Sequence, residues 1–304
     1  FNGHAWKGSP FRVEDSKWQI DSEHPTRFTL NSAPEDVQWL SYDTSRGNDF
    51  RATYAYNYAG DYRYRPYCSD LMTRFYVRTG SSRGRIGVSL GKYLARYKGW
   101  VDFQKGQMVI TRVFDGRETV LQSRTVEGVV LEKPAMLKFA NVDHLLTLEF
   151  GDQKLYFDLG RDPNDAGPIR EDVPPQVEIF GSGELTIWHV AIFRDIHYTN
   201  PYSGSWASRG NPFRLGADEF FALGDNSPNS QDSRAWRRRG RGNNGVSYRP
   251  GVVPRDYLVG KALFVYWPSF FRPYGKRVPV FIPNVGRMRF IYGGSAVSYT
   301  HLTL

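Results

Sequence analysis

Residues 224–234 bring many side chains that can do chemistry into a short stretch. Its sequence is GDNSPNSQDSR, and it directly follows the apolar segment FFAL. Gly224 lacks a β-carbon, so it can adopt a positive φ or permit the close approach of another group. Asp225 and Asn226 can hydrogen-bond their own backbone and make a turn rigid. The composition therefore predicts a well-defined turn after a strand.

The second half of this turn holds complementary polar groups. Asp232 and Arg234 have the chemistry for a bidentate ion pair between carboxylate and guanidinium. The Ser230 hydroxyl can both donate and accept a hydrogen bond. Such groups can brace a reaction centre, but the same residue types also cap ordinary solvated turns. Residue types alone leave both interpretations open.

The elements that must position this turn are predicted to be strands. The chain has 304 residues, which suggests about two domains. Hydrophobic residues make up 40% and charged residues 23%, as in folded rather than disordered proteins. The 15% aromatic share, with 30 Gly and 18 Pro, favours short strands and turns. We find no window with the apolar stripe of an amphipathic helix.

Alternating apolar residues predict a long β region before the turn. Alternate positions are apolar from Leu71 to Val77 and from Ile86 to Leu90. Two more alternating runs flank Gly151-Asp152-Gln153, which predicts a β-hairpin. Strands at intervals of about 10–20 residues, separated by turns, predict an antiparallel sandwich or jelly roll over residues 35–197. The predicted fold class is therefore mainly β.

The composition limits membrane segments and cofactors. No apolar run approaches the ~20 residues that a membrane helix needs. Cys68 is the single cysteine, which excludes an intrachain disulfide and a zinc site of several thiolates. Asn141 and Asp143 offer too few oxygen ligands for Ca²⁺ and are expected to form a tight turn. We expect neither a metal ion nor an organic cofactor.

The chain is basic, and the excess charge is local. The net charge is +9 and the pI is about 9.5. Five arginines lie close together: Arg234, Arg237, Arg238, Arg239 and Arg241. Such a run can contact anionic lipid, bind nucleic acid or form a solvated flexible loop. No nucleic-acid recognition module surrounds it, so no nucleic acid is expected, and Arg237–Arg241 is a candidate lipid contact.

The turn and a later segment resemble a known enzyme family. FFALGDNSPNSQDSR, followed by DYLVGKALFVYWP, is similar to the C-terminal catalytic signature of bacterial type I signal peptidases, which are membrane-anchored Ser/Lys-dyad endopeptidases. The segment RMRFIY at 287–292 is similar to the usual end of the family. The positions that fit in register are Gly224, Asp225, Asn226, Ser227, Ser230, Asp232, Ser233, Arg234, Gly260, Lys261, Ala262 and Pro268.

The resemblance implies a supporting role for each site residue. Ser230 would hydrogen-bond the catalytic lysine and help to orient it. Asp232 and Arg234 would form an ion pair that braces the floor of the active site. The segment 224–226, which contains Gly224, Asp225 and Asn226, would shape the turn beside the dyad. None of these residues would be the nucleophile or the base.

The dyad itself has no counterpart in these 304 residues. The family carries its nucleophile in a Ser-Met-x-Pro-type motif and its base in a strand similar to Lys-Arg-Val-x-Gly-x-Pro-Gly, and we find neither. The start, FNGHAWKGSPF, resembles the hairpin just after the lysine strand, and Lys7 lacks the strand context of a base. The resemblance implies an inactive fragment whose parent is held by a missing N-terminal helix in the bacterial cytoplasmic membrane. Its catalytic domain would lie on the outer face and cleave signal peptides from exported preproteins by acyl transfer.

A second segment resembles a binding fold. MLKFANVDHLLTLEFGDQKLYF is similar to paired strands of concanavalin-like (laminin G-like) jelly rolls, which occur as inserts in planctomycete-type signal peptidases. Such folds often bind sugars or peptides on a concave face. There, Trp100, Tyr97, Tyr62 and Tyr64 could stack on a ligand, or simply cover the sheets.

These expectations divide the chain into four parts. Residues 1–34 would be a remnant of the signal-peptidase catalytic β domain, 35–197 the jelly-roll insert, 198–294 the C-terminal part of the catalytic domain, and 295–304 a disordered or non-native tail. The expected function of the parent is removal of signal peptides. The alternative is a carbohydrate- or protein-binding β-sandwich module without catalytic activity.

Overall fold

The computed structural model describes residues 9–24, 26–51, 67–126, 132–160, 173–194, 204–208, 211–224 and 230–260, together with four short strands between 264 and 290. These residues form two compact units, one ending at Arg194 and the other starting at Gly204. The described residues contain strands and one 3₁₀ turn, η2 (Arg255–Tyr257), but no α-helix. The predicted fold class, mainly β, is confirmed. Within the same residues, no helix has the length and apolarity needed to cross a bilayer.

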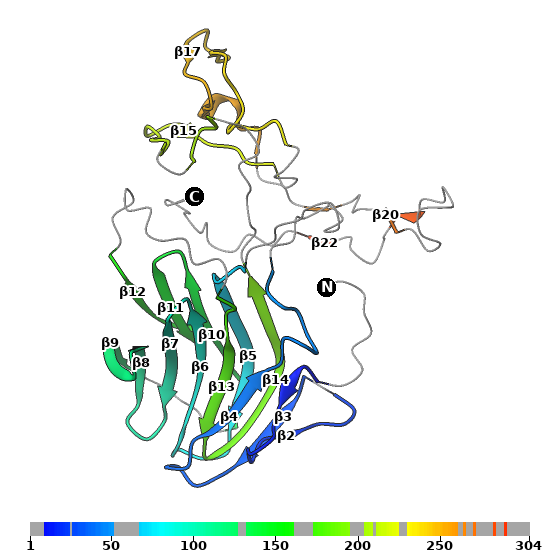
Figure 1. Ribbon diagram of the computed structural model, residues 1–304, viewed down its shortest axis with the longest axis vertical. Coiled ribbons are helices and arrows are strands. Elements are labelled where there is room, and N and C mark those ends of the chain that lie inside the picture. The colour runs from blue at the N-terminus through cyan, green and yellow to red at the C-terminus, as the bar shows by residue number, and fades with distance from the viewer. Residues whose placement is uncertain are drawn as a thin grey trace. The chain divides into compact units, whose positions relative to one another are not determined.

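The first unit is a sandwich of two antiparallel sheets, shown in Figure 1. The first sheet has seven strands in this spatial order: β1 (Phe11–Arg12), β4 (Gln38–Tyr42), β13 (Val177–Ser182), β6 (Arg85–Lys92), β7 (Ala95–Asp102), β8 (Gln107–Phe114) and β9 (Arg117–Thr125). The second sheet also has seven: β12 (Gln153–Asp158), β11 (Leu145–Phe150), β10 (Ala135–Val142), β5 (Leu71–Thr79), β14 (Glu184–Arg194), β3 (Phe28–Asn31) and β2 (Gln19–Ile20).

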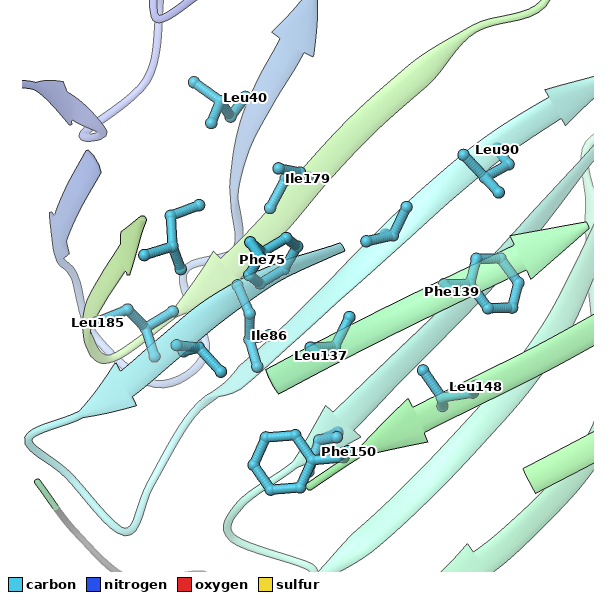
Figure 2. Close-up of a cluster of buried hydrophobic side chains, with 14 of the residues drawn as sticks. Leu40, Phe75, Ile86, Leu90, Leu137, Phe139, Leu148, Phe150, Ile179 and Leu185 are labelled. Carbon is cyan, nitrogen blue, oxygen red and sulfur yellow. The ribbon is translucent and has the colours of Figure 1, made fainter. Parts of the chain in front are cut away.

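The core lies between the two sheets and follows the predicted alternation. On β5, Phe75 and Val77 are buried, whereas Arg74 and Tyr76 point to the other side and are exposed. Figure 2 shows side chains of both sheets meeting in one apolar layer. Each fully buried Leu, Ile or Phe in such a layer contributes about 1.5–3 kcal/mol relative to an exposed one. Alternation therefore fixes which face of each strand turns inward.

Two predicted turns of the sandwich are present. β11 and β12 pair as an antiparallel hairpin, and the turn between them contains Gly151 with a φ of +56°. β10 and β11 are joined through Asp143, whose φ is +53°. Asn141, two residues earlier, is fully buried on β10. The predicted tight turn is therefore present at Asp143, whereas Asn141 lies within β10 and not in the turn.

The expected domain boundary at residue 35 lies inside the sandwich. Three strands before it belong to the sheets: β1 pairs with β4, β3 pairs with β14, and β2 pairs with β3. Phe11 and Phe28 are buried, and their rings meet edge to face 5.4 Å apart. The described part of 1–34 therefore supplies edge strands and core side chains to the sandwich. Residues 1–8 of the predicted hairpin, including Lys7, lie outside the described residues.

The second unit is built from very short strand pairs. They are β15 (Glu219–Phe220) with β18 (Val253–Pro254), β16 (Gly240–Arg241) with β17 (Ser247–Tyr248), β19 (Phe264–Val265) with β22 (Arg289–Phe290), and β20 (Phe270–Phe271) with β21 (Ile282–Pro283). In the structure, β15 ends at Phe220, and the chain from 258 to 260 follows η2 without strand pairing. The tail 295–304 lies outside the described residues.

Candidate functional site

Asp232 and Arg234 form a buried, bidentate ion pair in the second unit. Arg234 Nε donates to Asp232 Oδ1 at 2.8 Å, and Arg234 Nη2 donates to Asp232 Oδ2 at 2.6 Å. The Asp232 side chain is 7% exposed and the Arg234 side chain is 1% exposed. A fork of two parallel hydrogen bonds fixes both the distance and the plane of the two groups. The pair therefore fixes the relative positions of residues 232 and 234 within the turn.

The Asp232 carboxylate also holds the backbone around it. Its Oδ2 accepts a hydrogen bond from the Gly224 N–H at 2.9 Å, and its Oδ1 accepts one from the Arg234 N–H at 3.1 Å. Burial is the largest influence on the pKa of Asp232 and raises it. The hydrogen bonds from Arg234 and Gly224 together outweigh burial, so the pKa lies below its usual range. The carboxylate is ionised at neutral pH and connects both ends of the turn.

Ser233 ties the turn to the preceding segment. Its hydroxyl accepts a hydrogen bond from the Ala222 N–H at 2.9 Å, and its own N–H donates to the Ala222 carbonyl at 3.1 Å. Ser233 is fully buried. Ala222, before the turn, and Ser233, at its end, are therefore joined by two hydrogen bonds.

Ser230 lies directly against the backbone of Gly224. A β-carbon placed on Gly224 would overlap Ser230 Oγ and lie 2.7 Å from Ser230 Cβ. Only glycine leaves room for this side chain, which is the close approach that the sequence predicted for position 224. Among the described residues, the Ser230 hydroxyl has no hydrogen-bond partner. Packing alone positions it, and its donor and acceptor are available to a group outside those residues.

Replacing Gly224 by alanine is expected to displace Ser230 while leaving the buried ion pair in place. The new methyl group and the Ser230 side chain cannot occupy the same space. The other neighbour, Asp232, is held by its ion pair with Arg234, whereas Ser230 has no hydrogen bond among the described residues, so Ser230 should move. We expect a loss of about 1–3 kcal/mol, typical of an overpacked site. Backbone hydrogen exchange across 230–236 would measure it. Slowed or unchanged exchange would contradict the close approach.

Two tryptophans, Trp206 and Trp236, hydrogen-bond to backbone carbonyls of the turn and of the residues that follow it. The Trp206 N–H donates to the Arg234 carbonyl at 3.1 Å, and Trp206 Nε1 donates to the Trp236 carbonyl at 2.8 Å. Trp236 Nε1 donates to the Gln231 carbonyl at 2.8 Å. No sequence argument singled out Trp206, because its role depends on backbone hydrogen bonds to a segment well ahead in the chain. Asp225 and Asn226, which were also predicted site residues, lie outside the described residues.

The arginine run is partly ordered. The guanidinium of Arg237 lies over the Trp206 ring, 5.5 Å from its centre. Arg241 belongs to the β16–β17 hairpin, and its Nε donates to the Gly245 carbonyl at 3.2 Å. All four arginines from Arg237 to Arg241 are exposed. The structure adds a short hairpin, β16–β17, to this solvent-exposed segment.

The structure separates the predicted ligand-stacking aromatics of the sandwich. Trp100 lies on the outer face of the first sheet, which is the face turned away from the core. Tyr97 lies on the opposite side of the same strand and packs against the core cluster. Burial raises the pKa of its phenol. Tyr62 and Tyr64 lie outside the described residues.

Two solved structures are similar to part of this chain at low sequence identity. One is the carbohydrate-binding module CBM66 from Bacillus subtilis, with a TM-score of 0.39 and 10% identity, covering 61% of this chain and 96% of that chain. The other is the galectin LEC-6 from Caenorhabditis elegans, with a TM-score of 0.31 and 13% identity, covering 42% of this chain and 88% of that chain.

The region that contains the turn matches a family of proteases. Residues 194–267 match the family model described as signal peptidase, peptidase S26. A curated signal peptidase I from Leptolyngbya laminosa is 37% identical over 57 residues, which are 19% of this chain and 21% of that protein. The chain thus spans about a fifth of the length of this relative. Both comparisons support a signal peptidase S26 region in this chain, and the family match includes the Gly224–Arg234 turn.

Proposed function

We propose that residues 198–294 are the C-terminal part of the catalytic region of a type I signal peptidase. In the parent protein this region would remove N-terminal signal peptides from exported proteins. The match over residues 194–267 supports the family, and the identity to the Leptolyngbya protein supports the peptidase type. The sandwich is then a domain carried by the same protein as an insert.

The observation that carries this proposal is the geometry around Ser230. The buried Asp232–Arg234 pair fastens the Gly224 end of the turn, and Gly224 leaves room for Ser230. The result is a hydroxyl that is positioned by packing against Gly224 and has no hydrogen-bond partner among the described residues. An ordinary solvated turn does not require a guanidinium that is 1% exposed beneath it. A positioned, unpaired hydroxyl suits a residue that orients a catalytic amine.

The chemistry would be acyl transfer by a serine and a lysine located outside the 304 residues. A serine hydroxyl is a weak nucleophile and needs an adjacent base. A lysine can be that base when burial lowers its pKa enough to leave the amine neutral. Ser230 would accept a hydrogen bond from that amine and fix its direction. Asp232 and Arg234 would fix the backbone of Gly224, against which Ser230 packs, and would not touch the substrate.

The test is cleavage of a preprotein by the longer encoded protein and its Ser230→Ala variant. We expect the variant to lose at least about tenfold in rate, as removal of an acid–base positioning group usually does, and to keep its melting temperature. Ser247→Ala, which removes an exposed hydroxyl on β17, is the matched control and should cleave normally. The 304-residue chain alone should not cleave. Unchanged cleavage by the Ser230 variant would refute the assigned role.

The location of the parent protein follows from the same proposal. A type I signal peptidase acts at the outer face of the bacterial cytoplasmic membrane, where Arg237–Arg241 would face anionic headgroups. The exposure of all four arginines, of which Arg241 belongs to the β16–β17 hairpin, supports that contact. The alternative function is a sandwich that binds carbohydrate or protein without catalysis. It is favoured by the aromatic rings of Trp39, Phe180 and Trp100, which meet on the outer face of the first sheet at centre-to-centre distances of 4.9 and 6.1 Å.

A further inference from the structure

The β16–β17 hairpin ends in a turn that contains an Asn-Gly pair, Asn244 and Gly245. The Gly245 N–H donates to the Gly242 carbonyl at 2.9 Å, and the Gly242 N–H donates to the Val246 carbonyl at 2.8 Å. Asn244, Gly245 and Val246 are all exposed, and the hairpin has two residue pairs. Exposed structure held by so few hydrogen bonds opens at little free-energy cost. Water and dissolved bases therefore have access to the backbone of this turn.

The side chain of Asn244 folds back over the glycine that follows it. Asn244 Oδ1 accepts a hydrogen bond from the Val246 N–H at 2.9 Å, which closes a ring around Gly245. Such a turn keeps the amide carbon, Cγ, near the next backbone nitrogen. The Val246 N–H also lies where negative charge develops on the amide oxygen when a nucleophile attacks that carbon. Since Gly245 has no side chain, its nitrogen is not shielded from the amide carbon.

Asn243, the preceding residue of the same turn, is held differently. Its Nδ2 donates to the Asp256 carbonyl at 2.9 Å, and its N–H donates to Asp256 Oδ2 at 2.6 Å. The next nitrogen belongs to Asn244, whose side chain hinders an approach and whose N–H also donates to Asp256 Oδ2, at 3.3 Å. The two neighbouring asparagines therefore differ both in how the amide group is fixed and in access to the next nitrogen.

We propose that Asn244 is a site of spontaneous deamidation through a succinimide. When the turn opens, the Gly245 N–H is released from the Gly242 carbonyl, and a dissolved base takes its proton. The Gly245 nitrogen then bonds to Asn244 Cγ, the bond from Cγ to the side-chain nitrogen breaks, and ammonia leaves with a proton from solvent. Water adds to either ring carbonyl and breaks its bond to the ring nitrogen, which leaves aspartate or isoaspartate at position 244. Water is the only reactant consumed, and no atom is oxidised or reduced.

The product carries a new negative charge beside an existing one. A β-carbon built on Gly242 would lie 2.8 Å from Asn244 Oδ1 and 2.9 Å from Asp256 Oδ2, so these two oxygens are close together. Asp256 Oδ2 holds the turn to η2 through the N–H groups of Asn243 and Asn244. Like charges that are this close repel each other. Deamidation is therefore expected to loosen the contact between the hairpin and η2, and to lower the net positive charge around the arginine run.

The test is incubation of the 304-residue chain and of a synthetic peptide of residues 240–248 in the same buffer, followed by peptide mapping with mass spectrometry. The peptide has the same Asn-Gly pair without the rest of the unit, so its rate is the reference. The chain should deamidate at Asn244 within about tenfold of the rate of the peptide, because the hairpin opens easily. Isoaspartate should be among the products, since only opening of the ring forms it. The map separates this site from Asn2-Gly3, the other Asn-Gly pair.

Two variants serve as controls. Asn244→Gln keeps an amide but requires a larger ring that closes less readily, so position 244 should stay unmodified over the same time. Asn244→Asp reproduces one product; hydrogen exchange over 240–248 should be faster than in the wild type, and added salt should reduce the difference. Unchanged exchange would refute the expected effect on the hairpin. Three results would overturn the proposal: a rate at Asn244 more than about tenfold below that of the peptide, aspartate without isoaspartate, or equal modification of Asn243.

Discussion

Arg234→Ala is expected to destabilise the second unit by about 3–5 kcal/mol, the usual result of removing one partner of a buried ion pair. Arg234 is 1% exposed, and Asp232 would remain buried with an uncompensated charge. The same carboxylate holds the Gly224 N–H, so the loss should spread to the turn and to Ser230. Arg234→Lys should recover only part of it, because an ammonium group cannot reproduce the two parallel hydrogen bonds of a guanidinium.

Hydrogen exchange by mass spectrometry measures this loss locally, with the sandwich as an internal reference. Exchange should accelerate over 222–236 and stay unchanged over β6, which belongs to the other unit. Arg238→Ala is the matched control, because it removes an exposed arginine from the same segment. Equal protection in Arg234→Ala and Arg238→Ala would show that the ion pair does not brace the turn.

The Arg234→Ala effect should also depend on pH. In the wild type the pKa of Asp232 lies below its usual range, so its contribution to stability is present above the unfolded pKa of about 3.9 and is lost as pH falls through the lower folded value. Without Arg234, burial remains and protonation relieves the stranded charge. The difference in stability between wild type and variant should therefore be largest near neutral pH and shrink in acid. A constant difference would mean that charge is not its cause.

The sequence predicted elements whose side chains alternate between core and solvent. β5 and the β11–β12 hairpin are examples, because one face of each is buried and apolar. It missed β9, which is almost fully exposed at the edge of the first sheet and so has no apolar alternation to detect. It also separated residues 11–31 from the sandwich. β1 and β2 have two residues each, and their place is set by pairing with partners that local patterns do not reveal.

The same distinction applies to the two candidate sites. Asp232 and Arg234 are two positions apart, so their chemistry was visible in the sequence before their contact was known. The aromatic cluster of Trp39, Phe180 and Trp100 was not visible, because its members come from strands far apart in the chain and meet only through sheet register. From the sequence, Tyr97 and Trp100 were equivalent stacking candidates. They are three positions apart on one strand, and strand alternation sends them to opposite faces.

Phe139→Ala is expected to destabilise the sandwich by about 3–5 kcal/mol, the usual range for removing a fully buried phenylalanine. Phe139 on β10 is 0% exposed and lies in the core layer of Figure 2. Its ring crosses between the sheets to Gly99 on β7, where a β-carbon would lie 2.6 Å from Phe139 Cε2. Gly99→Ala should therefore overpack the core and cost about 1–3 kcal/mol by itself.

The two changes should be strongly non-additive when combined. In Phe139→Ala/Gly99→Ala, the new methyl group enters the space that the ring has left, so the clash disappears and the cavity is slightly smaller. The double variant should be more stable than the sum of the single effects predicts, by about 1 kcal/mol or more. Exchange of β6 and β10 amides would measure each variant, with Phe114→Ala, a change at an exposed ring, as the control. Additive effects would show that the Phe139 ring does not pack directly against Gly99.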